Sequence, residues 1–205
     1  MRVQAFKEIL QARLTAACQG CLQDLPAEIE GDKIYAFSIY ADSGCTSLGV
    51  AFATQGALER KNRESAADQL RAFVNTLNAA EWPYVNYHYE LFEAADELVD
   101  EFYDCLFDGE LEDVEFDPQI STAELTKFAS DIFVEVIVRS LLDLKAQGYF
   151  SGDAFTDDPL LGLQFGDPSD NGVNMMEDVS RQVNSAAWHE KMVRNCHYLK
   201  HGLPR

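Results

Sequence analysis

The feature that most constrains this chain is a run of residues, 72–126, that contains fifteen acidic residues and no Lys or Arg. The remainder is nearly balanced, with nine acids and eight bases in residues 1–71 and eleven acids and eight bases in residues 127–205. The formal net charge of -19 therefore arises mostly from about a quarter of the chain. Uncompensated charge of one sign opposes compaction, so the segment needs either a well-solvated location or a positively charged partner.

The rest of the composition predicts a folded, soluble chain. Its 205 residues are 47% hydrophobic and 11% aromatic, which is enough to bury one core, and we expect a single domain over residues 1–205. The sign of the charge disfavours direct binding to nucleic acid or to an acidic membrane surface. No signal peptide or membrane-spanning run is evident, and five cysteines, an odd number, favour free thiols in a reducing cytoplasm.

Hydrophobic periodicity predicts a mixture of helices and a few strands. Apolar residues recur every three or four positions from Val3 to Leu25, which indicates a helix that ends near Pro26. The segments IYAFSIYA and TSLGVAFAT flank the turn DSGC and predict a β-hairpin. The further elements are helices at about 56–77, 90–106 and 121–147, a strand at 160–165, and one or two helices over 175–200. We expect an α+β fold in which a small, mainly antiparallel sheet packs with several helices.

Side chains at the predicted helix boundaries and faces make these assignments specific. Ser121 with Glu124 has the spacing of a capping box, and Gly148 is a natural end for the same helix. GDPSDNG (166–172) is interpreted as a turn. The expected buried side chains of helix 56–77 are Leu70, Phe73, Val74 and Leu77, and those of helix 90–106 are Leu91, Ala95, Leu98, Phe102 and Leu106.

The acidic part of helix 90–106 is the strongest candidate for a functional surface. Glu93, Glu97, Asp100 and Asp104 fall three or four residues apart on the face opposite the apolar residues. A solvated helix face is the ordinary explanation for such a run, and it stays open. Two details favour docking of a basic protein instead: no lysine is available for i,i+4 pairing, and four aromatic residues precede the run. The proposed partner-binding residues are Trp82, Tyr84, Tyr87, Tyr89, Glu93, Glu97, Asp100, Glu101, Asp104 and Asp108.

Catalytic and metal-binding interpretations have less support. Cys18 and Cys21 are neighbours on a helix, and His197 with His201 could complete a zinc site, but no second cysteine pair exists and core packing is the simpler explanation. Cys45 and His88 could be combined as nucleophile and base, although nothing in their spacing requires it. Asp153, Asp157 and Asp158 lack the spacing of a calcium loop. We therefore expect no catalytic residues, no metal and no cofactor.

Three segments resemble a bacterial family, domain of unknown function 4303. They are IYAFSIYADSGCTSLGVAFAT, WPYVNYHYELFEAADEL and the later GLQFGDPSDN, which resemble that family's opening strand and hairpin, its Trp-led middle segment and its late strand with a PS-type turn. The resemblance supplies no catalytic motif. It implies a context, since such small domains look like immunity partners of bacterial polymorphic toxins.

These observations lead to a functional hypothesis with alternatives. We expect an immunity-type binding protein that sequesters a cognate, basic toxin, such as a nuclease, through its acidic surface. The alternative is a metal-dependent hydrolase that uses clustered carboxylates with His88 or the C-terminal histidines, and a scaffold protein also stays open. The docking hypothesis fails if lysines or arginines from elsewhere in the chain cover the acidic helix.

Overall fold

A four-stranded sheet forms the centre of the computed structural model, which describes residues 1–25, 29, 31–64 and 69–202. The strand order is β3-β2-β1-β4, with β1 the hairpin partner of β2. The bounds are Ile34–Ala41 (β1), Leu48–Thr54 (β2), Tyr84–Val85 (β3) and Phe155–Phe165 (β4). Two pairings are antiparallel and the β1–β4 pairing is parallel, so the expected α+β fold is confirmed with a mixed sheet.

The two faces of this sheet carry side chains of different size. Directly paired residues project from the same face, so the register places large apolar residues together and small residues together. The large face carries Phe37, Ile39, Val50, Phe52, Leu161 and Leu163, and the small face carries Ala36, Ser38, Gly49, Ala51, Ala53 and Gly162. Every one of these side chains or glycines is buried, which is why both β1 and β2 read as nearly continuous apolar runs.

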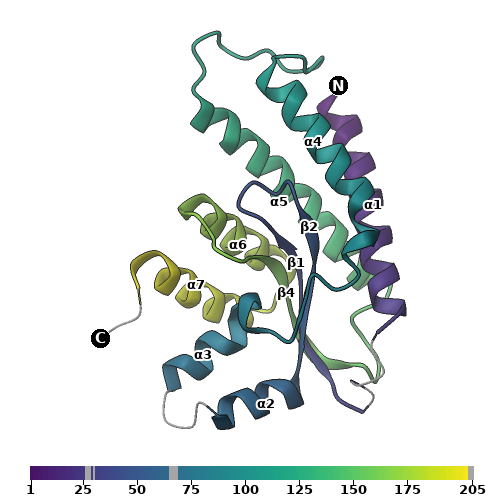
Figure 1. The fold of residues 1–205 in the computed structure, drawn as a ribbon, viewed down its shortest axis with the longest axis vertical. Helices are drawn as coiled ribbons and strands as arrows, with labels where there is room; N and C mark the ends of the chain where they lie inside the picture. Colours follow the sequence, from purple (N-terminus) through teal and green to yellow (C-terminus); the bar gives the residue numbers. More distant parts are fainter. Residues whose placement is uncertain (26–28, 30, 65–68, 203–205) are drawn as a thin grey trace.

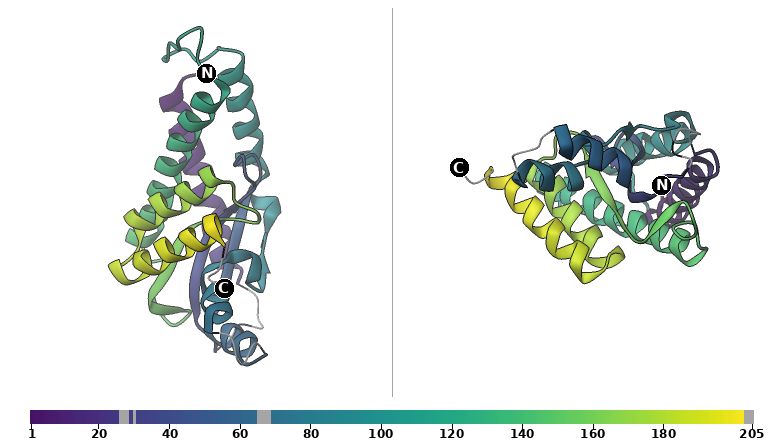
Figure 2. Two further views of the ribbon diagram at one scale, coloured as in Figure 1. Left: turned by 90° about the vertical axis from the view of Figure 1, so that its left-hand side faces the viewer. Right: turned by 90° about the horizontal axis from the view of Figure 1, so that it is seen from below.

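Helices cover the large face, and those of residues 3–23, 93–107 and 122–146 extend beyond one end of the sheet (Figures 1 and 2). The bounds are Val3–Gln23 (α1), Glu93–Phe107 (α4), Thr122–Ala146 (α5) and Asp170–Val183 (α6). Phe150, which follows α5, lies against Phe37, and Phe165 of β4 lies against Gly172 of α6. Helix α1 packs against both α4 and α5, so these three helices form one layer.

A more compact set of elements covers the small face. It comprises α2 (Gln55–Glu64), α3 (Gln69–Leu77), the short helix η2 (Ala79–Glu81) and, packed against α3 and α6, α7 (Ala186–His201). Gln164 of β4 ties this layer to the sheet, because its side-chain amide donates to the Leu77 carbonyl at 3.0 Å and accepts from Ala79 N at 3.4 Å. Small residues on the sheet allow that close approach.

The helix boundaries follow mostly from local capping. Ser121 and Glu124 form the expected capping box, and Gly148 takes a left-handed φ of 82° just after α5. The expected helix 56–77 is instead two helices, with residues 65–68 outside the described part of the chain. Pro26, the expected end of the first helix, is also outside it. Ser169 caps α6, so the segment interpreted as a turn already begins a helix.

Burial within the helices agrees with most of the expected inward faces. Ala95, Leu98, Phe102 and Leu106 are buried in α4, as expected. The prediction that Leu91 is buried is wrong, because Leu91 belongs to the short helix η3 (Tyr89–Leu91) and is 44% exposed. In α3 only Leu77 of the expected set is fully buried, and Leu70, Phe73 and Val74 are half-buried. None of the helices in the described ranges is long and apolar enough to cross a membrane.

Three phenylalanines join the layer of α1, α4 and α5. Phe6 stacks on Phe102 with ring centroids 4.1 Å apart, and Phe133 meets Phe6 edge-on at 6.2 Å and Phe102 at 6.1 Å. All three side chains are almost fully buried. One phenylalanine from each of the three helices therefore contacts the other two. Aromatic pairs in such geometries add stability beyond their buried area.

We expect Phe102→Ala to lower the free energy of unfolding by about 3–5 kcal/mol, because it leaves a cavity where the three helices meet. Phe107→Ala, on the next turn of α4 and half-exposed, is the matched control and should cost much less. Urea denaturation followed by circular dichroism measures both values. Equal losses for the two variants would show that the aromatic cluster does not hold the layer together.

The segment before α4 is held to α1 by a histidine between two carboxylates. His88 Nδ1 lies 2.8 Å from Glu90 Oε1, and Nε2 lies 3.0 Å from Asp24 Oδ2, near the end of α1, as an ion pair without hydrogen-bond geometry. The hydrogen bond to Glu90, followed by the charges of Glu90 and Asp24, raises the pKa of the His88 imidazole. His88 itself has a left-handed φ of 51°.

A raised folded-state pKa means that the stabilisation by His88 is complete below the unfolded-chain pKa of about 6.5 and is lost as pH rises through the folded value. We therefore expect the difference in unfolding free energy between wild type and His88→Asn to shrink from pH 5.5 to pH 8.5. Asn tolerates the left-handed conformation and does not titrate. His197→Asn, on exposed α7, controls for removal of a histidine. A His88 difference that does not change with pH would contradict the ion-pair assignment.

Candidate protein-binding surface

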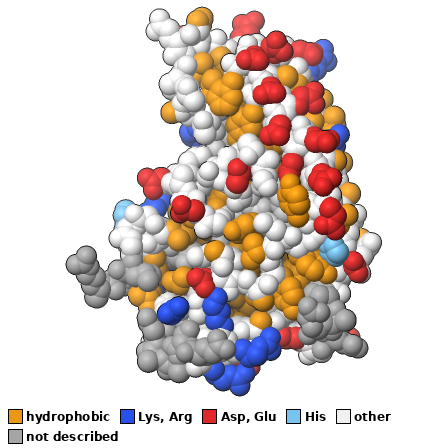
Figure 3. All heavy atoms as spheres, viewed as in Figure 1, with side chains coloured by type: hydrophobic (Ala, Val, Ile, Leu, Met, Phe, Trp, Pro, Cys, Tyr) orange, Lys and Arg blue, Asp and Glu red, His pale blue; other side chains and the backbone are white. Residues whose placement is uncertain are grey.

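One face of α4 carries a continuous line of carboxylates. Figure 3 shows acidic side chains along the length of this helix, while Lys and Arg side chains gather at the opposite end of the molecule, near α2. We call the set Glu93, Glu97, Asp100, Glu101, Asp104 and Asp108 the α4 acidic face. All six residues are exposed, as expected from the helical spacing. Fifteen residues at 1.5 Å each make α4 about 22 Å long.

About half of the acidic residues in segment 72–126 have partners within the protein. Their carboxylates pair with Lys61, His88 or Arg2, or accept hydrogen bonds from backbone N–H groups, as at the start of α1 and of α5. These seven residues are Glu81, Glu90, Asp96, Glu112, Asp113, Asp117 and Glu124. Eight of the fifteen remain, and six of those eight form the α4 acidic face.

No cation from the described part of the chain pairs with the α4 acidic face. Arg13 of α1 reaches α4, but its guanidinium donates to the backbone carbonyl of Ala94 and not to a carboxylate. The salt bridges at either end of the segment use Glu81 and Glu112, outside the face. A layer of lysines or arginines over the acidic helix would have contradicted the docking hypothesis. Residues 1–25, 29, 31–64 and 69–202 form no such layer.

A seventh carboxylate of α4 points inward and fixes the helix to the hairpin. Asp96 is 9% exposed, and its Oδ1 accepts a hydrogen bond from Leu48 N at 2.8 Å, at the start of β2. Burial, opposed by that hydrogen bond, raises the pKa of the Asp96 carboxyl to about 6. Tyr103, on the same side of α4, donates its hydroxyl to the Gly44 carbonyl at 2.7 Å in the hairpin turn. These two contacts set the rotation of α4 about its axis.

Exposed apolar side chains lie at both ends of the α4 acidic face. Tyr89 and Leu91 precede it with 43% and 44% of their surface exposed, and Phe107 follows it with 49% exposed. Leu91 is held against α1, where a Cβ on Gly20 would lie only 2.8 Å from a Leu91 methyl. Phe107 stacks on Tyr103 with centroids 5.8 Å apart. The face is thus a charged strip with apolar contacts at each end.

The structure corrects part of the expected aromatic set. Trp82 is only 5% exposed and meets Tyr35 edge-on at 6.4 Å, so it is a core residue and not a surface anchor. Tyr84 stacks on Phe52 at 4.4 Å and Tyr87 packs against the same ring, which leaves both half-buried. Of the four expected aromatic anchors, only Tyr89 is exposed.

Sequence reasoning missed Phe107 and Leu91 as surface residues. Phe107 lies just beyond the predicted helix 90–106, and Leu91 is predicted on the buried side of that helix. The signal that could have identified Phe107 is its position: it lies one helical turn after Asp104 and on the same side. Leu91 gives no such signal, because its exposure depends on the short helix η3 before α4.

The residues considered for catalysis or metal binding are not brought together. The thiols of Cys18, Cys21 and Cys45 are buried, and burial raises the pKa of each, which makes them poor nucleophiles. His88 is engaged with Glu90 and Asp24. The rings of His197 and His201 lie 4.6 Å apart on α7. Within the described residues, no group of three or more His, Cys, Asp or Glu side chains is placed to hold a metal ion.

The comparisons with known proteins identify a family and give no functional precedent. No curated protein and no solved structure matches the chain. The family described as "Domain of unknown function (DUF4303)" matches residues 14–185. This region includes the whole sheet and helices α2 to α6, together with the α4 acidic face. Because the match covers most of the sequence, the chain belongs to this family of domains of unknown function.

Proposed function

We propose that this protein is an immunity-type binding protein that sequesters and neutralises a cognate bacterial toxin in the cytoplasm. The toxin would be a basic protein domain, such as a nuclease, and the α4 acidic face would bind it. The observation that carries the proposal is the line of six exposed carboxylates for which the described chain supplies no cation. Nuclease domains carry basic clefts for phosphate groups, and an acidic inhibitor can occupy such a cleft.

The charge on α4 is poorly explained by stability. Acidic residues near the C-terminal end of a helix are unfavourable, each by about 0.3–1 kcal/mol, because the carbonyl ends of the helix are already negative. Asp104 and Asp108 lie there, and the last turn contains no basic residue to offset them. An exposed helix selected for stability would place lysines at i,i+4 from these acids. The arrangement of acidic residues on α4 therefore favours a role in binding another molecule.

The two kinds of side chain on this surface would do different work in binding. A field of one sign raises the rate of encounter with an oppositely charged protein, by about one to three orders of magnitude at low salt. Apolar side chains that become buried on contact mainly slow dissociation. Tyr89, Leu91 and Phe107 lie at the ends of the charged strip and fit the second role.

The alternative of a metal-dependent hydrolase gains no supporting geometry from the described residues. Its proposed ligands, His88 and the histidines of α7, belong to separate clusters with their own partners.

The proposal predicts growth rescue that depends on the α4 acidic face. The toxin to test is the C-terminal domain of the protein encoded by the adjacent upstream reading frame. Co-expression of the wild-type protein should restore growth, and the reversal of Glu93, Glu97, Asp100 and Asp104 to Lys should abolish or weaken the rescue. In stopped-flow mixing at low salt, this variant should associate about ten to a hundred times more slowly and with less dependence on salt.

A matched control separates the surface from the net charge. Reversal of Asp143, Asp153, Asp157 and Glu190 to Lys changes the total charge equally but alters exposed residues outside α4. This control should keep the rescue and most of the association rate. Unchanged association of the α4 variant over a range of salt concentrations, with its circular dichroism intact, would exclude α4 as the docking face.

The apolar ends of the face give a second, kinetic prediction. Phe107→Ala should raise the dissociation rate from the same toxin about tenfold while it leaves the association rate nearly unchanged, since contact residues act after encounter. Leu142→Ala is the control, because Leu142 is an exposed apolar residue on α5. Surface plasmon resonance measures both rates. If Phe107→Ala slows association and spares dissociation, the division of labour proposed for this surface is wrong.

A further inference from the structure

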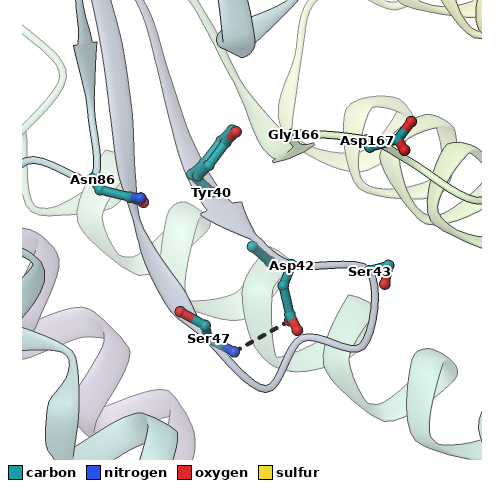
Figure 4. A pocket seen from close by; sticks show the side chains of 8 residues that line it. Tyr40, Asp42, Ser43, Ser47, Asn86, Gly166 and Asp167 are labelled. Carbon is teal, nitrogen blue, oxygen red and sulfur yellow. Dashed lines mark hydrogen bonds between the residues drawn. The ribbon is translucent and has the colours of Figure 1, made fainter.

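An open cavity of about 400 Å³ lies at the carboxyl ends of β1 and β4 (Figure 4). Because these two strands are parallel, the residues that follow them meet at one edge of the sheet: Asp42 after β1, and Gly166 with Asp167 after β4. Tyr40, Ser47 and Asn86 also line the cavity. The edge where parallel strands end is the usual place for a ligand in an open sheet, and the volume is that of a small-molecule site.

Two glycines leave the space that the cavity side chains occupy. A Cβ on Gly166 would lie 2.6 Å from the Tyr40 hydroxyl, and a Cβ on Gly49 would lie 3.1 Å from Asn86 Oδ1. Any larger residue at these positions would push the hydroxyl or the amide aside. The polar ends of Tyr40 and Asn86 therefore lie close to the backbone just after β4 and to the backbone of β2, respectively.

Several polar groups of the cavity have no partner in the described protein. No hydrogen bond is made by the Tyr40 hydroxyl, the Asn86 side-chain amide or the Asp167 carboxylate to any residue in the ranges that the structure describes. Asp42 differs, because its carboxylate already accepts from Thr46 N at 2.7 Å and from Ser47 N at 3.2 Å, which holds the hairpin turn. Asn86 and Asp167 are exposed and Tyr40 is half-buried, so all three can contact a ligand that enters from solvent.

The charge of the cavity selects the kind of ligand. Asp42 and Asp167 line it, and no Lys, Arg or His does. Two carboxylates repel an anion and attract a cation, and a planar guanidinium pairs well with a carboxylate and with the face of an aromatic ring.

We propose that this cavity binds an organic cation with a guanidinium or primary ammonium group. Asp167 pairs with the charge, and Tyr40 and Asn86, which lie to one side of Asp167 in Figure 4, contact the remainder of the ligand. The cation is either the side chain of Arg or Lys on a bound protein or a free amine of the same chemistry. The site does not depend on the toxin partner proposed above, because its walls come from the end of β1, the hairpin turn, the residues just after β4 and Asn86, and none comes from α4.

The test is a titration of the full-length, isotope-labelled protein with N-acetyl-L-argininamide, followed by two-dimensional NMR. Its control ligand is N-acetyl-L-citrullinamide, which replaces the guanidinium by an uncharged urea of nearly the same shape. The arginine derivative should give saturable shifts at the amides of Asn86, Gly166 and Asp167, and the citrulline derivative should bind at least about tenfold more weakly. Equal binding of the two, or shifts confined to α4, would overturn the proposal.

Substitutions in the cavity test the assigned roles. Asp167→Asn keeps the shape and removes the charge, so it should weaken arginine binding about tenfold or more. Asp153→Asn, an exposed carboxylate in another turn, should have no effect. Gly166→Ala should displace the Tyr40 hydroxyl and also weaken binding. Because that backbone change could disturb the fold, Tyr40→Phe gives a second measurement. Affinity unchanged by Asp167→Asn would show that the cation does not bind here.

A peptide distinguishes the two sources of the cation. An arginine-containing basic peptide that binds more tightly than N-acetyl-L-argininamide, with a gain that disappears on reversal of the α4 carboxylates, identifies a protein side chain. Equal affinities identify a free amine. Failure of growth rescue would reject the toxin partner and leave the NMR result unaffected, so the two proposals fail separately.

Discussion

The packing of Phe102 between Phe6 and Phe133 is the interaction on which the α4 acidic face depends. Helix α4 carries six acidic residues and no base, and its C-cap Asp108 adds a seventh carboxylate, so mutual repulsion opposes its formation. Burial of one face, centred on this phenylalanine, supplies the compensating free energy. It also fixes which way the helix faces: with Phe102 buried and Asp96 bonded to the start of β2, the remaining carboxylates can only face solvent. The hydrophobic layer of α1, α4 and α5 therefore determines the electrostatics of the surface.

The acidic surplus has two separate physical roles. One part satisfies backbone N–H groups or pairs with cations: Asp113 accepts from the first turn of α1, Glu124 closes the cap of α5, and Glu81 binds Lys61. Such uses occur in any folded protein. The α4 acidic face is different because its carboxylates have no such partners in the described chain and because Asp104 and Asp108 lie at the unfavourable end of the helix dipole. Charge density in the sequence alone could not separate these two groups.

Sequence reasoning succeeded where the information was local. The spacing of apolar residues gave the inward face of α4, the hairpin of β1 and β2, and the cap of α5, because each depends on residues within one or two turns. It failed where the information was tertiary. The burial of Trp82 requires the small-residue face of the sheet, and the exposure of Leu91 requires η3 to end before α4 begins. The cavity was missed for a similar reason: Asp42 and Asp167 line the same cavity only through the parallel pairing of β1 with β4, which lie more than a hundred residues apart.

The α4 acidic face and the cavity would recognise a basic partner at different distances. A field of six exposed carboxylates acts over a distance of about one Debye length, roughly 8 Å at physiological salt, and attracts any basic protein. It gives speed with little selectivity. The proposed cation site would act only on contact, and its carboxylates would distinguish a guanidinium from a urea by charge. The Asp96–Leu48 contact holds α4 against the hairpin whose turn provides Asp42. The two surfaces therefore share one support, so under both proposals a basic partner drawn toward α4 would come close to the hairpin turn that forms part of the cavity.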